Sequence, residues 1–88
     1  MNKNELRETL EGLRTDLATL RFRDPQSRER VQQLVSAIER QIDNADDAES
    51  LAAVHKDLSG AIDRFEAEHP TLTATLNQIA SALSSMGI

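Results

Sequence analysis

The spacing of large apolar residues is the feature of this 88-residue chain that most restricts its fold. In the first quarter of the chain, leucines recur at alternating steps of four and three: Leu6, Leu10, Leu13, Leu17 and Leu20. At about 100° per residue, these positions fall within a stripe about 80° wide on one side of an α-helix, as in a coiled-coil seam. Three later stretches carry apolar residues at similar steps, so the sequence predicts an all-α protein.

Two prolines and one polar segment separate the four stretches. Proline disfavours helical geometry at the preceding residue but suits the first helical position, so Asp24-Pro25 and His69-Pro70 each end one helix and start another. Residues 44–47 include no proline or glycine, yet Leu51 lies about 180° around the helix from Ile42, and Asn and Asp favour caps and turns. An uninterrupted middle helix, whose two halves serve different neighbours, is the alternative. The sequence predicts helices at 3–22, 25–43, 47–68 and 70–86.

Residues suited to capping stand at the expected helix ends. The candidate N-caps of the first three helices are Asn2, Asp24 and either Asp46 or Asp47. Glu5 follows the first cap by three residues, as in a capping box. At the far end, Gly87 can adopt the left-handed conformation just past the last helix, which would bring Ile88 back onto Leu83 in a Schellman-type stop.

The connections predict how the helices are arranged. The tight Asp-Pro turn brings the second helix back antiparallel to the first. At this length we expect one domain, residues 1–88, that folds as a small antiparallel bundle of about four helices. Such a bundle is marginal in size, so it is completed either by the single chain or by dimerisation, including an intertwined dimer whose middle helices run on.

The composition excludes several classes of protein. Without cysteine the chain has no disulfide framework, thiolate nucleophile or cysteine zinc site, which favours a reducing, cytoplasmic location. We expect neither a signal peptide nor a membrane span, because no apolar stretch is long enough. A net charge of −5 and only two aromatic residues also disfavour nucleic-acid binding.

The last predicted helix differs from the others because residues 70–88 contain no charged side chain. Its face opposite the apolar stripe forms a candidate interface that consists of Ala74, Asn77, Gln78, Ser81, Ser84 and Ser85. Small uncharged residues let a second helix approach without desolvating an ion. This helix is therefore either buried on two sides, centrally in the bundle or across a subunit interface, or presents a solvated polar face. We expect a homodimer.

The junction before the last helix contains the spacing Glu66-x-x-His69, which places both side chains on one helix face, as in di-iron bundles. One copy is insufficient for such a site, so we expect no metal, no other cofactor and no catalytic residue. Glu66, His69, Pro70 and Gly87 are instead predicted to be structural junction residues. A pH-sensing role for His69 beside Glu66 is the alternative.

Four arginines near the first turn form the only basic patch that is evident in the sequence: Arg21, Arg23, Arg28 and Arg30. The simpler interpretation is a solvated turn in which Phe22 closes the core. The other interpretation is a seat for an acidic partner.

The C-terminal stretch from Phe65 to Leu72, with its Phe-Glu-x-x-His-Pro motif, and the terminal Met86-Gly87-Ile88 resemble a family of short bacterial proteins known only as a domain of unknown function. The leucine-rich first helix and the Asp-Pro turn are similar to that family too. This resemblance implies a bacterial, cytoplasmic, helical protein. It implies no activity, partner or functional residue.

The leading functional hypothesis is a non-enzymatic helical module for protein-protein interaction or oligomerisation. The alternative is a small regulatory adaptor that docks its uncharged C-terminal helix on a larger protein. A metal-dependent helical-bundle enzyme that uses Glu66 and His69 is a third, weaker hypothesis.

Overall fold

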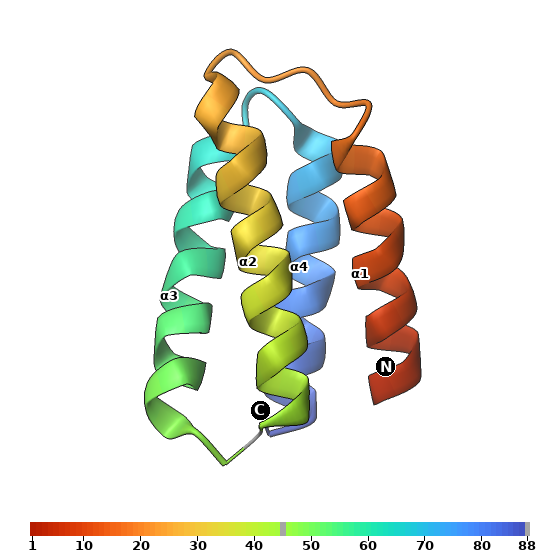
Figure 1. Cartoon of the computed structure of the whole chain (residues 1–88), viewed down its shortest axis with the longest axis vertical. Coiled ribbons are helices and arrows are strands. Elements are labelled where there is room, and N and C mark those ends of the chain that lie inside the picture. The colour runs from red at the N-terminus through yellow and green to blue at the C-terminus, as the bar shows by residue number, and fades with distance from the viewer. Residues whose placement is uncertain (45, 88) are drawn as a thin grey trace.

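The structure, a computed structural model, describes residues 1–44 and 46–87, which form four α-helices and no strand. The helices are α1 (Lys3–Leu17), α2 (Pro25–Asp43), α3 (Ala48–Phe65) and α4 (Pro70–Ser85). Each helix packs against the one before and after it in the chain, and α1 closes the ring against α4. Figure 1 shows the resulting antiparallel bundle, which measures 36 × 23 × 18 Å. The predicted all-α bundle is confirmed.

The core is built from the four apolar stripes. Its buried apolar residues are Leu6, Leu10, Leu13, Leu17, Val31, Leu34, Val35, Ile38, Ile42, Val54, Leu58, Phe65, Leu72, Leu76, Ile79, Ala82 and Leu83. The remaining stripe residues, Leu20, Leu51, Ile62 and Met86, are partly buried against this cluster. Each fully buried large apolar side chain stabilises the fold by about 1.5–3 kcal/mol, so these stripes supply the main driving force.

Three helix starts are capped by the side chains that the sequence indicates. Asn2 Oδ1 accepts a hydrogen bond from the backbone N–H of Glu5 at 2.9 Å. Asp24 caps α2, and Asp47, rather than Asp46, caps α3. His69 occupies the cap position of α4 without a side-chain cap bond, and Pro70 follows it in the first turn. Proline suits this place because it brings no N–H that needs a partner.

The predicted break between the second and third helices is confirmed, since α2 ends at Asp43 and α3 begins at Ala48. Gln41, which is only 2% exposed, helps to hold this connection. Its Nε2 donates to the backbone oxygens of Asn44 at 3.3 Å and Asp47 at 3.4 Å. Ala45, which was part of the predicted break, lies outside the described residues.

The first helix is shorter than the predicted 3–22, because α1 ends at Leu17. In a continuous helix, Phe22 would lie about 200° around from Leu20, on the side away from the core. Ending the helix early frees Phe22 to pack against the core cluster. Arg28 then bonds carbonyls that the ended helix leaves open, with its Nε donating to Leu17 O at 2.8 Å and its Nη2 donating to Leu20 O.

The third helix is also shorter than the predicted 47–68. It ends at Phe65, and residues 66–68 form a turn in which the N–H of His69 donates to Phe65 O at 2.7 Å. The fourth helix ends at Ser85, one residue before its predicted end at 86. Gly87 has φ of +71°, which confirms the left-handed stop. The predicted contact of Ile88 with Leu83 lies outside the part of the chain that the structure describes.

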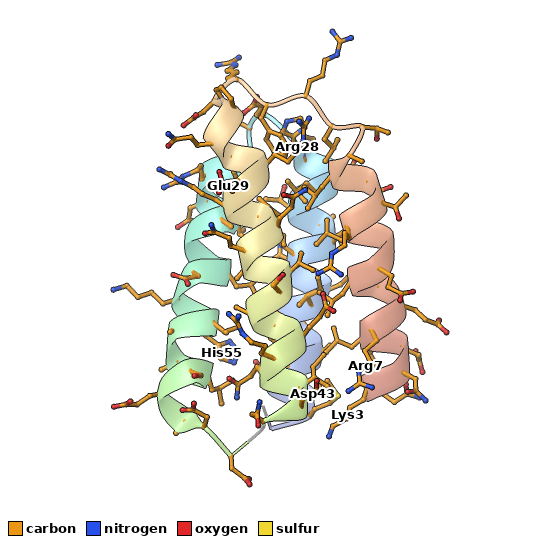
Figure 2. All side chains as sticks on the ribbon, in the orientation of Figure 1. Lys3, Arg7, Arg28, Glu29, Asp43 and His55 are labelled. Atoms are coloured by element: carbon orange, nitrogen blue, oxygen red, sulfur yellow. The ribbon has the colours of Figure 1, made fainter. Side chains whose placement is uncertain are left out.

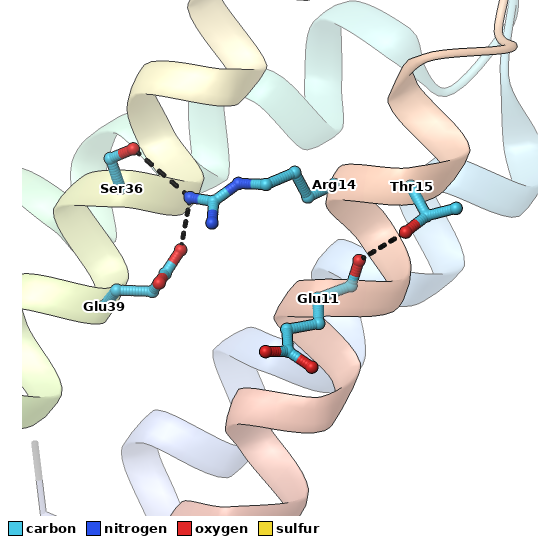
Figure 3. Close-up of polar contacts among 5 residues, drawn as sticks. All are labelled: Glu11, Arg14, Thr15, Ser36 and Glu39. Atoms are coloured by element: carbon cyan, nitrogen blue, oxygen red, sulfur yellow. Dashed lines mark hydrogen bonds and ion pairs between the residues drawn. The ribbon is translucent and has the colours of Figure 1, made fainter.

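Two exposed ion pairs join α1 to α2. Arg14 Nη2 lies 2.5 Å from Glu39 Oε1 and 3.5 Å from Ser36 Oγ (Figure 3). Near the other end of the helices, Arg7 Nη2 lies 2.6 Å from Asp43 Oδ1 (Figure 2). All four charged side chains are at least 39% exposed, so each pair adds only about 0–1 kcal/mol. These pairs help to set the register of the two helices.

Candidate functional site

The outer face of α4 is exposed along its length. Its predicted interface residues, Ala74, Asn77, Gln78, Ser81, Ser84 and Ser85, are all solvent-exposed, whereas the opposite side of the helix packs against α1 and α3. The idea that the single chain's own bundle buries this helix on two sides is therefore wrong. A subunit interface and a solvated face both remain open, and we call these six residues the α4 face.

A shallow depression of about 350 Å³ lies over most of the α4 face. Met1 borders it, and this is the single large apolar side chain among the described residues that is exposed, at 45%. The Sδ atom of Met1 accepts a hydrogen bond from Thr9 Oγ1 at 3.9 Å. This contact ties the N-terminal residue to α1, beside α4. The result is an uncharged stretch of side chains that reaches from α4 to the start of the chain.

The predicted structural junction lies at the end of the bundle where α3 joins α4. The rings of Phe22 and Phe65 meet edge to face, with centroids 5.5 Å apart, and the imidazole of His69 lies 4.7 Å from Phe22. The guanidinium of Arg28 lies 5.8 Å from the centre of the Phe22 ring. Arg28 stands at this upper end of the bundle in Figure 2. These contacts close the core, as the simpler interpretation of the basic patch predicts for Phe22.

The carboxylate beside His69 belongs to Glu68 and not to Glu66, which is exposed and outside ion-pair range. Glu68 Oε1 lies 3.7 Å from His69 Nε2 and accepts a hydrogen bond from the backbone N–H of Arg23 at 2.7 Å. His69 Nε2 is buried and has no hydrogen-bond partner. The hypothesis of a pH sensor that pairs Glu66 with His69 is therefore wrong in its choice of acid.

The described residues include no candidate metal-binding group and no candidate membrane-spanning helix. In residues 1–44 and 46–87, no group of three or more His, Asp or Glu side chains is arranged to hold a metal ion. None of the helices in this part of the chain combines the length and apolar character needed to cross a lipid bilayer.

The α4 face and the junction near His69 lie at different places on α4, and the structure does not bring them together into one site.

A furrow that the sequence patterns do not indicate lies between α2 and α3. Two hollows, of about 600 and 880 Å³, follow one another along these helices and share Ala37, Arg40 and Asp57 in their walls. We call them together the α2–α3 furrow. Comparing the outer faces of the second and third predicted helices would have shown cations on both. Pairing those two faces, however, requires the tertiary structure.

The lower end of this furrow is the end near the α2–α3 connection. There the carboxylate of Asp47 accepts hydrogen bonds from Ser50 N at 3.1 Å and Ser50 Oγ at 2.8 Å. Both bonds favour the charged carboxylate, the backbone bond more strongly, and they hold the pKa of Asp47 below its ordinary value of 3.8. Asp47 therefore stays ionised at neutral pH and gives this end of the furrow a fixed negative charge.

The comparisons with known proteins identify a family but no activity. The family model described as "Domain of unknown function (DUF4404)" matches residues 6–88. No curated protein and no solved structure matches the chain.

Proposed function

The chain belongs to the DUF4404 domain-of-unknown-function family, and from that premise we propose that it is a non-enzymatic helical interaction module that forms homodimers through the α4 face. The observation that carries this proposal is that the α4 face is both exposed and uncharged. The other helices each carry at least five charged residues, whereas α4 carries none. An exposed helix normally spreads charge for solubility, so a face without charge is suited to being covered.

The side chains of the α4 face favour a helix as the partner. Ala74, Ser81, Ser84 and Ser85 are small, so the backbone of a facing helix can come close. Asn77 and Gln78 can exchange hydrogen bonds with the same residues of a second copy. No ion has to leave water when this face is covered, which avoids a cost of several kcal/mol per charge. A symmetric contact of α4 with α4 meets all of these conditions.

The size of the α4 face sets the affinity that we expect for the dimer. Contact through one helix covers less than the roughly 800 Å² per partner of stable complexes. We therefore expect a dissociation constant in the micromolar range or above. Because no charged group takes part, the contact should respond little to salt.

The test is sedimentation of the protein over a hundredfold range of concentration, compared with the Ser81→Glu/Ser85→Glu variant. A matched control, Gln32→Glu/Ser59→Glu, adds the same charge at exposed positions of α2 and α3. Circular dichroism must show that all three proteins are equally helical. At high salt, which screens contacts between charged surfaces, we expect the intact protein and the control to dimerise with rising concentration and the α4 variant to stay monomeric. Equal association of all three proteins would contradict the proposed contact, and a monomer at every concentration would favour the adaptor hypothesis.

A further inference from the structure

The α2–α3 furrow carries opposite charges at its two ends. Its upper half is lined by Arg30, Arg64, Arg40 and Lys56, with Asp57 as the one acid. Its lower half is lined by Asp43, Asp46, Asp47 and Asp57, with Arg40 and Lys3 as the cations. Figure 1 shows the two helices that line the furrow, with α3 ascending at the left of the view and α2 descending at its centre.

The cations of the upper half have no ionic partner within the described part of the chain. Among the described residues, the arginines that form ion pairs with carboxylates are Arg7 and Arg14. Neither of them lines the furrow. With four cations and one acid in its walls, the upper half of the furrow is locally basic in a chain whose net charge is −5. These cations leave a local positive potential that attracts carboxylates from outside the molecule.

Small residues line parts of both halves of the furrow, and Arg40 and Asp57 stand with Ala37 where the halves meet. Ala37, Ala53, Gly60 and Ala61 stand in its walls. A Cβ atom placed on Gly60 would meet nothing within 4 Å, so the space over this residue is open. The larger apolar residues beneath, Val31, Leu34 and Phe65, are at most 6% exposed. The backbone of a second chain can therefore approach the furrow closely. Charged side chains, rather than exposed apolar surface, would orient that chain.

We propose that the α2–α3 furrow is a second self-association surface, on which two copies of the chain pack face to face and antiparallel. A two-fold axis in the plane of the contact and perpendicular to the helices sets α2 against α2 and α3 against α3. The basic end of each furrow then lies over the acidic end of the other. Arg30 faces Asp43 of the second copy, which keeps its own ion pair with Arg7, and Arg64 faces Asp46 of that copy. Symmetry makes each of these contacts occur twice.

The charge pattern selects a second copy over other occupants. A nucleic acid or a uniformly acidic peptide would be attracted at the upper end and repelled by the aspartates at the lower end. The occupant must carry both signs in reverse order over the same length. The chain's own furrow has this pattern.

The size of this surface predicts a weak, salt-sensitive contact. α2 has 19 residues and is therefore about 28 Å long, and two adjacent helices are about 20 Å wide. The area is thus roughly 500–600 Å² per copy, below the roughly 800 Å² of a stable complex. Since exposed charges set its register, we expect this contact to weaken about tenfold between 50 and 500 mM salt.

The furrow contact goes beyond the proposed α4 dimer and can be tested apart from it. The α4 face is bordered by Met1 and the furrow by α2 and α3, so the two surfaces do not overlap. The parent protein for the test is therefore the Ser81→Glu/Ser85→Glu variant, in which the α4 contact is removed. If the α4 proposal fails, this parent still reports on the furrow.

The experiment is a charge exchange in that parent. One variant carries Arg30→Glu/Arg64→Glu and the other carries Asp43→Lys/Asp46→Lys, and all four side chains are exposed. The control Arg21→Glu/Arg23→Glu makes the same charge change as the first variant, but at the α1–α2 connection. Sedimentation equilibrium at low salt and millimolar protein measures association, and circular dichroism checks that each variant is folded.

We expect the parent and the control to dimerise and each furrow variant to be monomeric, because like charges meet at both ends. An equal mixture of the two furrow variants should dimerise again, since opposite charges then meet at both ends. A monomeric parent, furrow variants that associate like the control, or a mixture that stays monomeric would each overturn the proposal. Binding of a 15-residue poly-L-glutamate peptide or a 15-nucleotide oligothymidine by a monomeric parent would also overturn it.

Discussion

The ring of Phe22 lies 4.7 Å from the imidazole of His69 and 5.5 Å from the ring of Phe65, measured between centroids. The first of these residues comes from the α1–α2 connection, and the other two flank the α3–α4 turn. Figure 1 shows that both turns lie at the same end of the bundle, and this aromatic contact joins them. It is the reason that the first helix ends early, since a longer helix would point Phe22 away from the core.

Replacing Phe22 by alanine should destabilise the protein by about 2 kcal/mol. This is less than the 3–5 kcal/mol of a fully buried phenylalanine, because Phe22 is partly exposed. The loss should be smaller for Phe22→Leu, which keeps most of the apolar contact with Phe65. Urea unfolding followed by circular dichroism measures both changes. Equal stability of the alanine variant and the natural protein would show that this aromatic contact does not hold the turns together.

Core packing should outweigh the surface ion pairs by several-fold. Leu76→Ala removes a fully buried side chain and should cost about 2–5 kcal/mol. Arg14→Ala breaks the ion pair with Glu39 but should cost less than about 1 kcal/mol, because both partners are well exposed. The midpoints of urea unfolding distinguish the two. A larger loss for Arg14→Ala than for Leu76→Ala would contradict this account of stability.

Two glycines should respond in opposite directions to alanine. Gly12 lies inside α1, and an added Cβ would meet nothing within 4 Å, so Gly12→Ala should stabilise the protein by about 1 kcal/mol. Gly87 has φ of +71°, where alanine is strained, so Gly87→Ala should destabilise the end of α4. Thermal unfolding of the two variants gives the signs directly. A stabilised Gly87→Ala variant would contradict the left-handed stop.

The Asp47 cap should make part of the stability sensitive to acid. The pKa of this carboxyl is lowered in the folded chain, so its ionised form stabilises the fold above the ordinary value of 3.8. That contribution is lost as the pH falls through the lowered pKa. Asp47→Asn keeps an acceptor for Ser50 N but no charge, whereas Asp47→Ala loses the cap.

Melting temperatures of the three proteins between pH 7 and pH 2 check this prediction. At pH 7 we expect the natural protein to be the most stable and the alanine variant the least. The gap between the natural protein and Asp47→Asn should narrow as the pH drops below 3.8. A gap that stays constant down to pH 2 would rule out a stabilising charge at Asp47.

The local features of this protein follow from its amino-acid sequence. Side chains within a few residues of each other set three kinds of feature: the bounds of α2, the caps at Asn2 and Asp24, and the break before Ala48. The apolar stripes likewise identified most of the core, because helical periodicity depends only on spacing along the chain. The uncharged face of the last helix could also be predicted, since charge is a property of composition.

Tertiary packing sets the features that join distant segments. It ended α1 at Leu17, because the contacts of Phe22 and Arg28 outweigh the local preference to continue the helix. It places Glu68 beside His69, where the sequence spacing had indicated Glu66, because the turn after Phe65 reorients the side chains. It also created the α2–α3 furrow, whose charges come from two helices that packing alone brings side by side.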